Sequence, residues 1–206
     1  MDRARIQISM ETLRFIRLTG NEIGTVINDL GKLRITVFRD FPYLYNGTMD
    51  YELEHLRSYI QSPGAFLFAV YDGEQMVGAT TCVPLSDENP ELTLPFTDAG
   101  FSTEGILYFG ESILLPEYRG MGLGHRFFDE RERYAQSLGN IHTTCFCSVV
   151  RPESHPLRPK DYRSNEAFWA KRGYAPNGLT CQFDWQDIDQ PQIDAKTLNF
   201  WTKQWQ

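Results

Sequence analysis

The segment that most restricts the fold of this chain is 105–138, where a hydrophobic strand, a glycine-rich turn and a helix are predicted in direct succession. The strand occupies 105–115 and Pro116 ends it. Glycines 120, 122 and 124 follow, and apolar residues then recur every three to four positions up to Leu138. The first amides of a helix are unpaired and lie at the positive end of its dipole. The turn therefore predicts an anion site suited to a pyrophosphate.

The glycine spacing alone leaves two interpretations open. The dinucleotide pattern G-x-G-x-x-G is absent because no third glycine falls at the required offset, and no Gly-Lys-Ser/Thr sequence marks a Walker loop. An ordinary glycine-rich turn explains the spacing as well as a phosphate site does. Within the preceding strand, Gly110 predicts a β-bulge or a close approach of another group to the backbone.

The rest of the chain predicts a mixed fold with interspersed strands and helices. Strands are expected at 11–18, 65–71, 76–84, 105–115, 141–150 and 179–185, with an Asp-Gly hairpin turn after the second. Helices are expected at 23–33, 48–61, after the glycine turn to Leu138, and at 165–172. Between them lie an aromatic connector or ligand-side loop at 34–48, a surface insertion at 85–104, a proline-rich loop at 151–163 and a weakly patterned tail from about 190.

Length and charge narrow the class of protein further. The 206 residues favour a single domain, and a formal charge of −7 argues against a general nucleic-acid binder but suits cationic or amine-bearing substrates. No run of about 18 apolar residues occurs and no apolar segment follows Met1, so we expect no membrane span, no secretory signal and a cytoplasmic location. The four cysteines, which form no zinc pattern, are expected to be buried free thiols, and no metal is expected.

Two segments resemble the signatures of one protein family. The sequence Arg119-Gly-Met-Gly-Leu-Gly124 is similar to the Arg/Gln-x-x-Gly-x-Gly/Ala motif of the GNAT superfamily, the acyl-CoA-dependent N-acetyltransferases. Leu115-Pro-Glu-Tyr118 matches the usual approach to this motif from the fourth strand. Further on, Ala167-Phe-Trp-Ala-Lys-Arg-Gly-Tyr174 resembles the second signature, a short helix that ends in Gly-Phe/Tyr. The order of elements from 11 to 185 also fits.

The resemblance implies an α/β (α+β) mixed-sheet fold in which a bulged fourth strand splays from the fifth, within one N-acetyltransferase domain over 1–206. It implies acetyl-CoA as cosubstrate, its pantetheine arm lying in the V-shaped cleft against backbone groups of Ser112, Ile113 and Leu114. The pyrophosphate is then expected on the loop Arg119, Gly120, Met121, Gly122, Leu123, Gly124 and His125. Asn165 is expected either to hydrogen-bond the cofactor or to cap the short helix with Ser164.

The sequence departs from the family pattern at one catalytic position, because Trp169 stands where the family places a tyrosine that protonates the leaving thiolate. An indole N–H is too weak an acid for that role. Glu111 is the first candidate for the base, since burial in an apolar strand would raise its pKa, although pairing with an arginine is the alternative. His155, in the stiff loop after the fifth strand, is the second candidate, with an exposed surface histidine as the alternative.

These features predict an enzyme that moves an acetyl group from acetyl-CoA to a primary amine of a small molecule or protein, by direct transfer in a ternary complex. The acceptor pocket is expected from segments 34–48, 85–104 and 151–163. Two alternatives stay open: a non-catalytic acyl-CoA-binding regulatory module, suggested by Trp169, and another acyl acceptor or a decarboxylation on the same fold. No nucleic-acid or membrane partner is expected, and the aromatic tail could mediate a homodimer.

Overall fold

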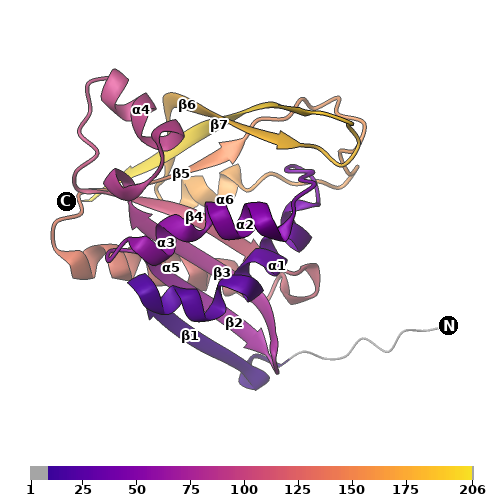
Figure 1. Ribbon diagram of the computed structural model, residues 1–206, viewed down its shortest axis with the longest axis horizontal. Coiled ribbons are helices and arrows are strands. Elements are labelled where there is room, and N and C mark those ends of the chain that lie inside the picture. The colour runs from indigo at the N-terminus through magenta and orange to yellow at the C-terminus, as the bar shows by residue number, and fades with distance from the viewer. Residues whose placement is uncertain (1–8, 206) are drawn as a thin grey trace.

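The computed structural model describes residues 9–205, which form one twisted seven-stranded sheet with helices on both faces (Figure 1). The charged N-terminal segment lies outside the described residues. The strand order is β1-β2-β3-β4-β5-β7-β6, and every neighbouring pair is antiparallel except β4 and β5. The strands are β1 Leu13–Thr19, β2 Phe66–Asp72, β3 Gln75–Pro84, β4 Ile106–Leu114, β5 Thr143–Val149, β6 Ala175–Gln186 and β7 Ile193–Gln204. The predicted mixed α/β architecture is confirmed.

The α-helices form two layers around this sheet. They are α1 Ile27–Phe38, α2 Met49–His55, α3 Arg57–Gln61, α4 Pro90–Asp98, α5 Leu123–Leu138 and α6 Glu166–Lys171. Short 3-10 turns add η1 Met10–Thr12, η2 Gly20–Val26, η3 Leu85–Asp87 and η4 Pro116–Tyr118. Figure 1 shows α1, α2 and α3 across one face of the sheet and α5 behind it.

The strands divide the core between these two layers because successive side chains point to opposite faces. In β2, Leu67, Ala69 and Tyr71 belong to the cluster that also contains Leu30 and Leu33 of α1. The alternating residues of β2 belong to a second cluster with the aromatic face of α5: Phe66, Phe68, Val70, Phe127 and Phe128. The sheet is therefore covered on both sides, as its nearly continuous apolar strands require.

The parallel pair β4–β5 is short, and this opens the sheet. Pairing is limited to three positions, from Ile106↔Thr143 to Tyr108↔Cys145. Beyond Tyr108, β4 continues beside β3 while β5 continues beside β7. The two strands thus diverge, and the splay expected from the family resemblance is present. We call this point, at Tyr108 and Cys145, the fork.

A β-bulge lies directly beyond the fork. Thr80 pairs with Ser112 and Cys82 with Phe109, so Gly110 and Glu111 together stand opposite the single residue Thr81. A side chain at Gly110 would overlap the Tyr59 hydroxyl and would lie 2.7 Å from Thr81 Oγ1. Both features predicted from this glycine, a bulge and a close approach, are confirmed.

Three segments differ from the sequence-based expectation. Helix α1 extends through Phe38, so the aromatic connector begins inside a helix. The 85–104 segment contains α4, in which Leu92 and Phe96 are buried. Its prolines suggested an irregular surface insertion, but a proline at the first position favours a helix.

The expected C-terminal tail is instead strand β7, which lies between β5 and β6. Lys196, Leu198 and Phe200 alternate as buried residues along it. The charged head of Lys196 hid this period-two pattern in the sequence. Of the three aromatic residues in this segment, Phe200 and Trp201 are buried in the core and Trp205 is half-buried.

The cysteines carry no disulfide within the described residues: Cys82, Cys145 and Cys181 are buried free thiols and Cys147 is half-buried. Among residues 9–205, none of the helices is both long and apolar enough to cross a membrane.

Candidate active site

The glycine loop after β4 presents free amides at the start of α5. Gly120 and Gly122 adopt φ of +80° and +83°, a left-handed conformation that favours glycine. Gly122 caps the helix without a side-chain hydrogen bond, and within residues 9–205 no hydrogen-bond acceptor is recorded for any amide of 120–125. A Cβ at Gly120, Gly122 or Gly124 would meet nothing within 4 Å. The loop is therefore open and its amides are available, as an anion site requires.

The outer half of β4 leaves one backbone edge open beside this loop. Ser112, Ile113 and Leu114 pair with β3 on one side. On the other side, β4 and β5 register only through Tyr108. The 112–114 edge therefore has no strand partner across the fork in the described chain, and it can pair with an extended ligand.

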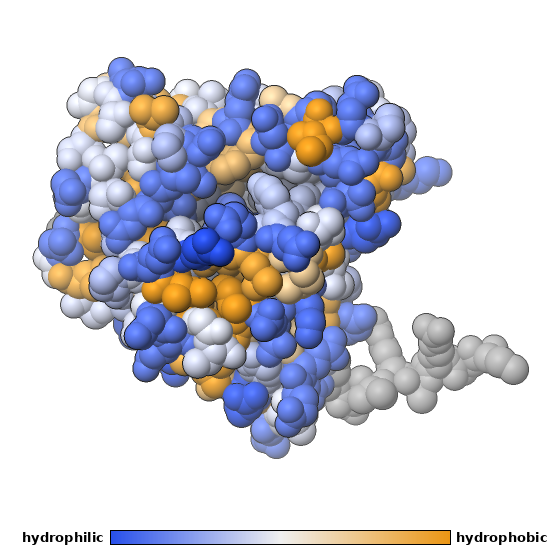
Figure 2. All heavy atoms as spheres, viewed as in Figure 1, coloured by the Kyte–Doolittle hydropathy of each residue, from blue (hydrophilic) through white to orange (hydrophobic). Residues whose placement is uncertain are grey.

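A pocket rich in aromatic residues reaches the fork from the α1–α3 face. It encloses a cavity of about 120 Å³ and touches the fork through Tyr108, Gly110, Glu111 and Cys147. Its polar members also include Arg34, His55 and Glu88. Figure 2 shows this face hollowed near its middle, between the first helices and the β6–β7 hairpin. We call this cavity the aromatic pocket after its eight aromatic side chains: Phe38, Tyr43, Tyr45, Tyr51, Tyr59, Tyr108, Phe183 and Trp185.

Glu111 points into a buried ion-pair network. The Arg34 guanidinium pairs with Glu111 and with Glu52, and the Thr81 hydroxyl donates to the Glu111 carboxylate. Burial alone would raise the pKa of Glu111, but the Arg34 charge and the Thr81 hydrogen bond outweigh it, so the pKa lies below its ordinary value. The expected upward shift of the Glu111 pKa is therefore wrong, and the alternative of pairing with an arginine is what the structure contains.

Two titratable side chains of the aromatic pocket escaped the sequence analysis. Burial and the nearby Glu111 charge raise the pKa of Glu88 to about 7. Burial and Arg34 lower the pKa of His55 to about 4, so this ring is neutral at physiological pH. Glu88 lies in the segment expected to be a surface insertion, and His55 lies in the helix expected at 48–61. No motif accompanies either residue in the sequence.

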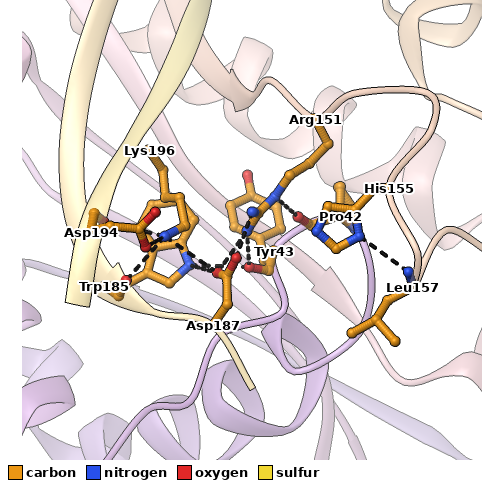
Figure 3. Close-up of polar contacts among 9 residues, drawn as sticks. All are labelled: Pro42, Tyr43, Arg151, His155, Leu157, Trp185, Asp187, Asp194 and Lys196. Atoms are coloured by element: carbon orange, nitrogen blue, oxygen red, sulfur yellow. Dashed lines mark hydrogen bonds and ion pairs between the residues drawn. The ribbon is translucent and has the colours of Figure 1, made fainter. Parts of the chain in front are cut away.

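His155 does not line the aromatic pocket. Its ring packs beside Phe41, with 5.8 Å between centroids, and its Nδ1 accepts from the Leu157 amide at 3.2 Å within its own loop (Figure 3). None of the cavity-lining residues comes from 151–163. Of the three segments expected to form an acceptor pocket, two therefore contribute to the aromatic pocket, the connector 34–48 and the 85–104 segment.

Arg151, in the same loop, fixes one wall of the aromatic pocket. Its guanidinium pairs with both carboxylate oxygens of buried Asp187, at 2.6 and 2.8 Å, and donates to the carbonyls of Pro42 and Tyr43, each at 2.7 Å (Figure 3). The Trp185 indole donates to the same Tyr43 carbonyl at 3.1 Å. We call this arrangement the Arg151 clasp; it joins the aromatic connector to the ends of β5 and β6.

The second signature lies across the sheet from the aromatic pocket. Asn165 is exposed at the start of α6 and makes no capping hydrogen bond, whereas Ser164 Oγ accepts from the Glu166 amide. Trp169 packs against Phe146 and Trp201, with centroids 5.0 and 5.2 Å apart. His125 lies beside Phe168 at the start of α5. No cluster of three or more potential metal ligands occurs in the part of the chain that the structure describes.

Comparison with known proteins agrees with this geometry. The chain is similar to an acetyltransferase from Streptococcus agalactiae (TM-score 0.56, 13% identity, covering 95% of this chain and 100% of that one). It is also similar to a ribosomal-protein-alanine N-acetyltransferase from Brucella melitensis (TM-score 0.57, 14% identity, 93% and 99% covered). A third structure, PaiA N-acetyltransferase from Thermoplasma acidophilum in complex with coenzyme A, has TM-score 0.53 and 10% identity, with 94% and 99% covered.

At these identities the likeness shows the fold alone. No curated protein sequence matches the chain. The sequence profile of the Acetyltransferase (GNAT) family, however, matches residues 32–158, more than half of the chain. This match spans the fork, the glycine loop and most of the aromatic pocket, and the chain therefore belongs to the GNAT acetyltransferase family.

Proposed function

We propose that the protein transfers an acetyl group from acetyl-CoA to a primary amine, by direct transfer in a ternary complex. The observation that carries this proposal is that the glycine loop and the aromatic pocket both adjoin β4 at or near the fork. The free amides of 120–125 lie at the end of β4, and the aromatic pocket meets β4 at Tyr108, Gly110 and Glu111. A donor held on the loop and an acceptor held in the pocket would meet at the fork.

The residues present fit acetyl-CoA. In this proposal the pyrophosphate lies on the amides of Arg119, Gly120, Met121, Gly122, Leu123, Gly124 and His125, where the dipole of α5 favours an anion. Ser112, Ile113 and Leu114 supply the strand edge for the pantetheine arm. Asn165, whose side chain is not used for capping, is available as a further hydrogen-bonding group. The thioester supplies the activated acetyl group.

The acceptor chemistry follows from the pocket and the overall charge. An amine must lose a proton before it can attack a thioester carbonyl, so the site needs a base near the fork. The net charge of −7 favours the approach of a cationic acceptor. Glu111 and His155 remain candidate bases from the sequence, although the first is held ionised by Arg34 and the second lies outside the aromatic pocket.

Thiol release in the presence of amines tests the function. We expect acetyl-CoA to raise the melting temperature and free CoA to appear at a rate that depends on added amine. Stabilisation without release for any amine would instead favour the non-catalytic acyl-CoA-binding module that Trp169 suggests. Glu111→Gln and His155→Ala in the same assay measure whether either of these side chains is needed for turnover.

A substitution in the glycine loop tests the location of the pyrophosphate. Gly124 has open space and an ordinary φ, so a longer side chain fits without backbone strain. Gly124→Glu places a carboxylate beside the proposed anion site, and we expect it to weaken CoA binding about 10- to 100-fold more than isosteric Gly124→Gln, since repulsion costs on the order of 1–3 kcal/mol. Equal affinities of the two variants for CoA in calorimetry would contradict this location.

A further inference from the structure

The two carboxylates of the aromatic pocket differ in their charge partners. Glu111 is neutralised by Arg34 and hydrogen-bonded by Thr81. Glu88 is half-buried, and within residues 9–205 no lysine, arginine or histidine lies within ion-pair distance of it. Its recorded hydrogen bond is a long one, in which Oε2 accepts from the Asn89 amide at 3.3 Å. Of the two pocket carboxylates, Glu88 is therefore the one that can still form an ion pair with a ligand.

The groups around Glu88 keep its pKa close to neutral pH. The titratable groups near enough to interact with its charge are Arg34 of α1, Tyr59 of α3, Asp87 of η3, Tyr108 and Glu111 of β4, and Cys145 of β5. Burial and the Glu111 charge raise its pKa to about 7. The Asn89 amide and Arg34, which is already shared between two other carboxylates, offset this rise only in part. A group with this pKa is suited to accept a proton near physiological pH.

The walls of the aromatic pocket favour a particular kind of ligand. Tyrosine, phenylalanine and tryptophan rings attract a cation to their faces and cover an apolar body by contact. Leu92 and Leu198 add purely apolar surface. The pocket thus combines aromatic walls, a carboxylate without a basic partner, and a direct opening to the fork.

We propose that Glu88 binds the ammonium group of a compact primary amine with an apolar body in the aromatic pocket, and takes up its proton before acetyl transfer. This inference rests on the proposed function, because it names the acceptor class and the base of that reaction. It differs from the sequence-based candidates in placing the base on the segment between β3 and β4.

The proton and electron balance of the step is simple. One N–H proton of the ammonium moves to the Glu88 carboxylate, which leaves a neutral amine. The amine lone pair forms the C–N bond, and the C–S bond breaks with its electrons on sulfur. A second N–H proton leaves the nitrogen as the thiolate gains a proton, so the products are amide and thiol. Glu88 then returns its proton to solvent.

Amine binding without acetyl-CoA provides the first test. With 2-phenylethylamine as probe, we expect calorimetric binding to the wild type, at least tenfold weaker binding to Glu88→Gln, and at least tenfold weaker binding of the neutral isostere 2-phenylethanol to the wild type. Glu91→Gln, an exposed acid of α4, is the matched control and should bind like the wild type. Equal binding to Glu88→Gln and the wild type, or preference for an alanine-terminated peptide over the probe, would overturn the proposal.

The pH dependence of acetylation provides the second test. In the wild type, kcat/KM for 2-phenylethylamine should rise with pH through a limb near pH 7, because protonated Glu88 cannot accept a proton. Glu88→Gln should lose that limb and at least tenfold in kcat, and Glu88→Asp should regain part of both. An unchanged limb in Glu88→Gln would reject Glu88 as the base. The binding test needs no turnover. Glu88-dependent amine binding without acetyl transfer to any amine would therefore reject the proposed function and the role of Glu88 as its base, whereas loss of Glu88-dependent binding in an active enzyme would reject this inference alone.

Discussion

Arg34 is the residue on which the buried electrostatics of the site depend. It is buried in α1 and pairs with both Glu52 and Glu111, which are themselves buried. Removing one member of such a network leaves uncompensated charge in a low-dielectric interior. Exposed pairs contribute far less, since water already solvates both partners.

Arg34→Met should therefore destabilise the fold by about 3–5 kcal/mol at neutral pH, measured by urea unfolding. The surface pair Arg57–Glu54, with both side chains mostly exposed, offers the control Arg57→Met, which should change stability by less than about 1 kcal/mol. Similar losses in the two variants would contradict the proposed importance of the buried network.

The lowered pKa of Glu111 determines how the stability difference between the wild type and Arg34→Met changes with pH. In the wild type, this carboxylate stabilises the fold above its unfolded-state pKa of about 4.3, and that contribution is lost as the pH falls through the lower folded-state value. In Arg34→Met, burial raises the same pKa, so protonation relieves the unpaired charge. The stability gap between wild type and variant should shrink on acidification from pH 7 to pH 4; a constant gap would contradict it.

At the residue level, the sequence could identify Glu111 as a residue of the site but could not predict the direction of its pKa shift. An acid within an apolar strand stood out at once, and it does line the pocket at the fork. Its charge partner is 77 positions away in the chain, on a different element. Pairing over such a distance depends on tertiary packing, which is why the direction of the pKa shift could not be predicted.

At the level of elements, the bulge in β4 couples the sheet to helix α3. Because Gly110 has no side chain, the Tyr59 hydroxyl can approach the strand at the fork. We expect Gly110→Ala to lower stability by about 1–3 kcal/mol, as overpacking in a dense interior does. The measurement is chemical denaturation, with CoA affinity as a second readout.

The double variant Gly110→Ala/Tyr59→Phe separates overlap from other effects of the new methyl group. Removing the hydroxyl removes the atom that would lie nearest to the Cβ, ahead of Thr81 Oγ1 at 2.7 Å. The combined loss should therefore be smaller than the sum of the two single losses, a coupling of about 0.5–3 kcal/mol. Additive losses would show that the Tyr59 contact does not set the requirement for glycine.

At the level of the whole molecule, β7 completes the sheet between β5 and β6. Phe200 is fully buried in it, whereas Ile193 in the same strand is 68% exposed. Phe200→Ala should lower the free energy of unfolding by about 3–5 kcal/mol, and Ile193→Ala should change it by about 0.5 kcal/mol or less. If the segment were a loose tail, both substitutions would be neutral, and thermal or urea unfolding distinguishes the two cases.

The parts of the fold that the sequence predicted are those with local signals. The Asp-Gly hairpin, the start of a helix at residue 48 and the strand–glycine–helix succession each depend on neighbouring residues, and all three are present. The missed parts depend on distant ones. Lys196 can occupy a buried position of β7 because its amine donates to the Trp185 carbonyl across the hairpin. Helix α4 buries Leu92 and Phe96 only by packing against the rest of the molecule.

The Arg151 clasp also limits how the molecule can admit large acceptors. One guanidinium holds the Pro42–Tyr43 backbone to Asp187, and backbone hydrogen bonds from Asn46 to Gln186 and from Ile188 to Leu44 join the same segments. The tyrosine side of the cavity is therefore firmly attached to the hairpin. On the opposite rim, formed by α2 and residues 88–92, no hydrogen bond or ion pair to the 186–194 part of that hairpin occurs within residues 9–205. We expect movement of the entrance at this rim. In the proposed reaction, bulkier acceptors would have to displace α2 and residues 88–92. Substitutions in these two segments are therefore the way to widen the entrance of the aromatic pocket.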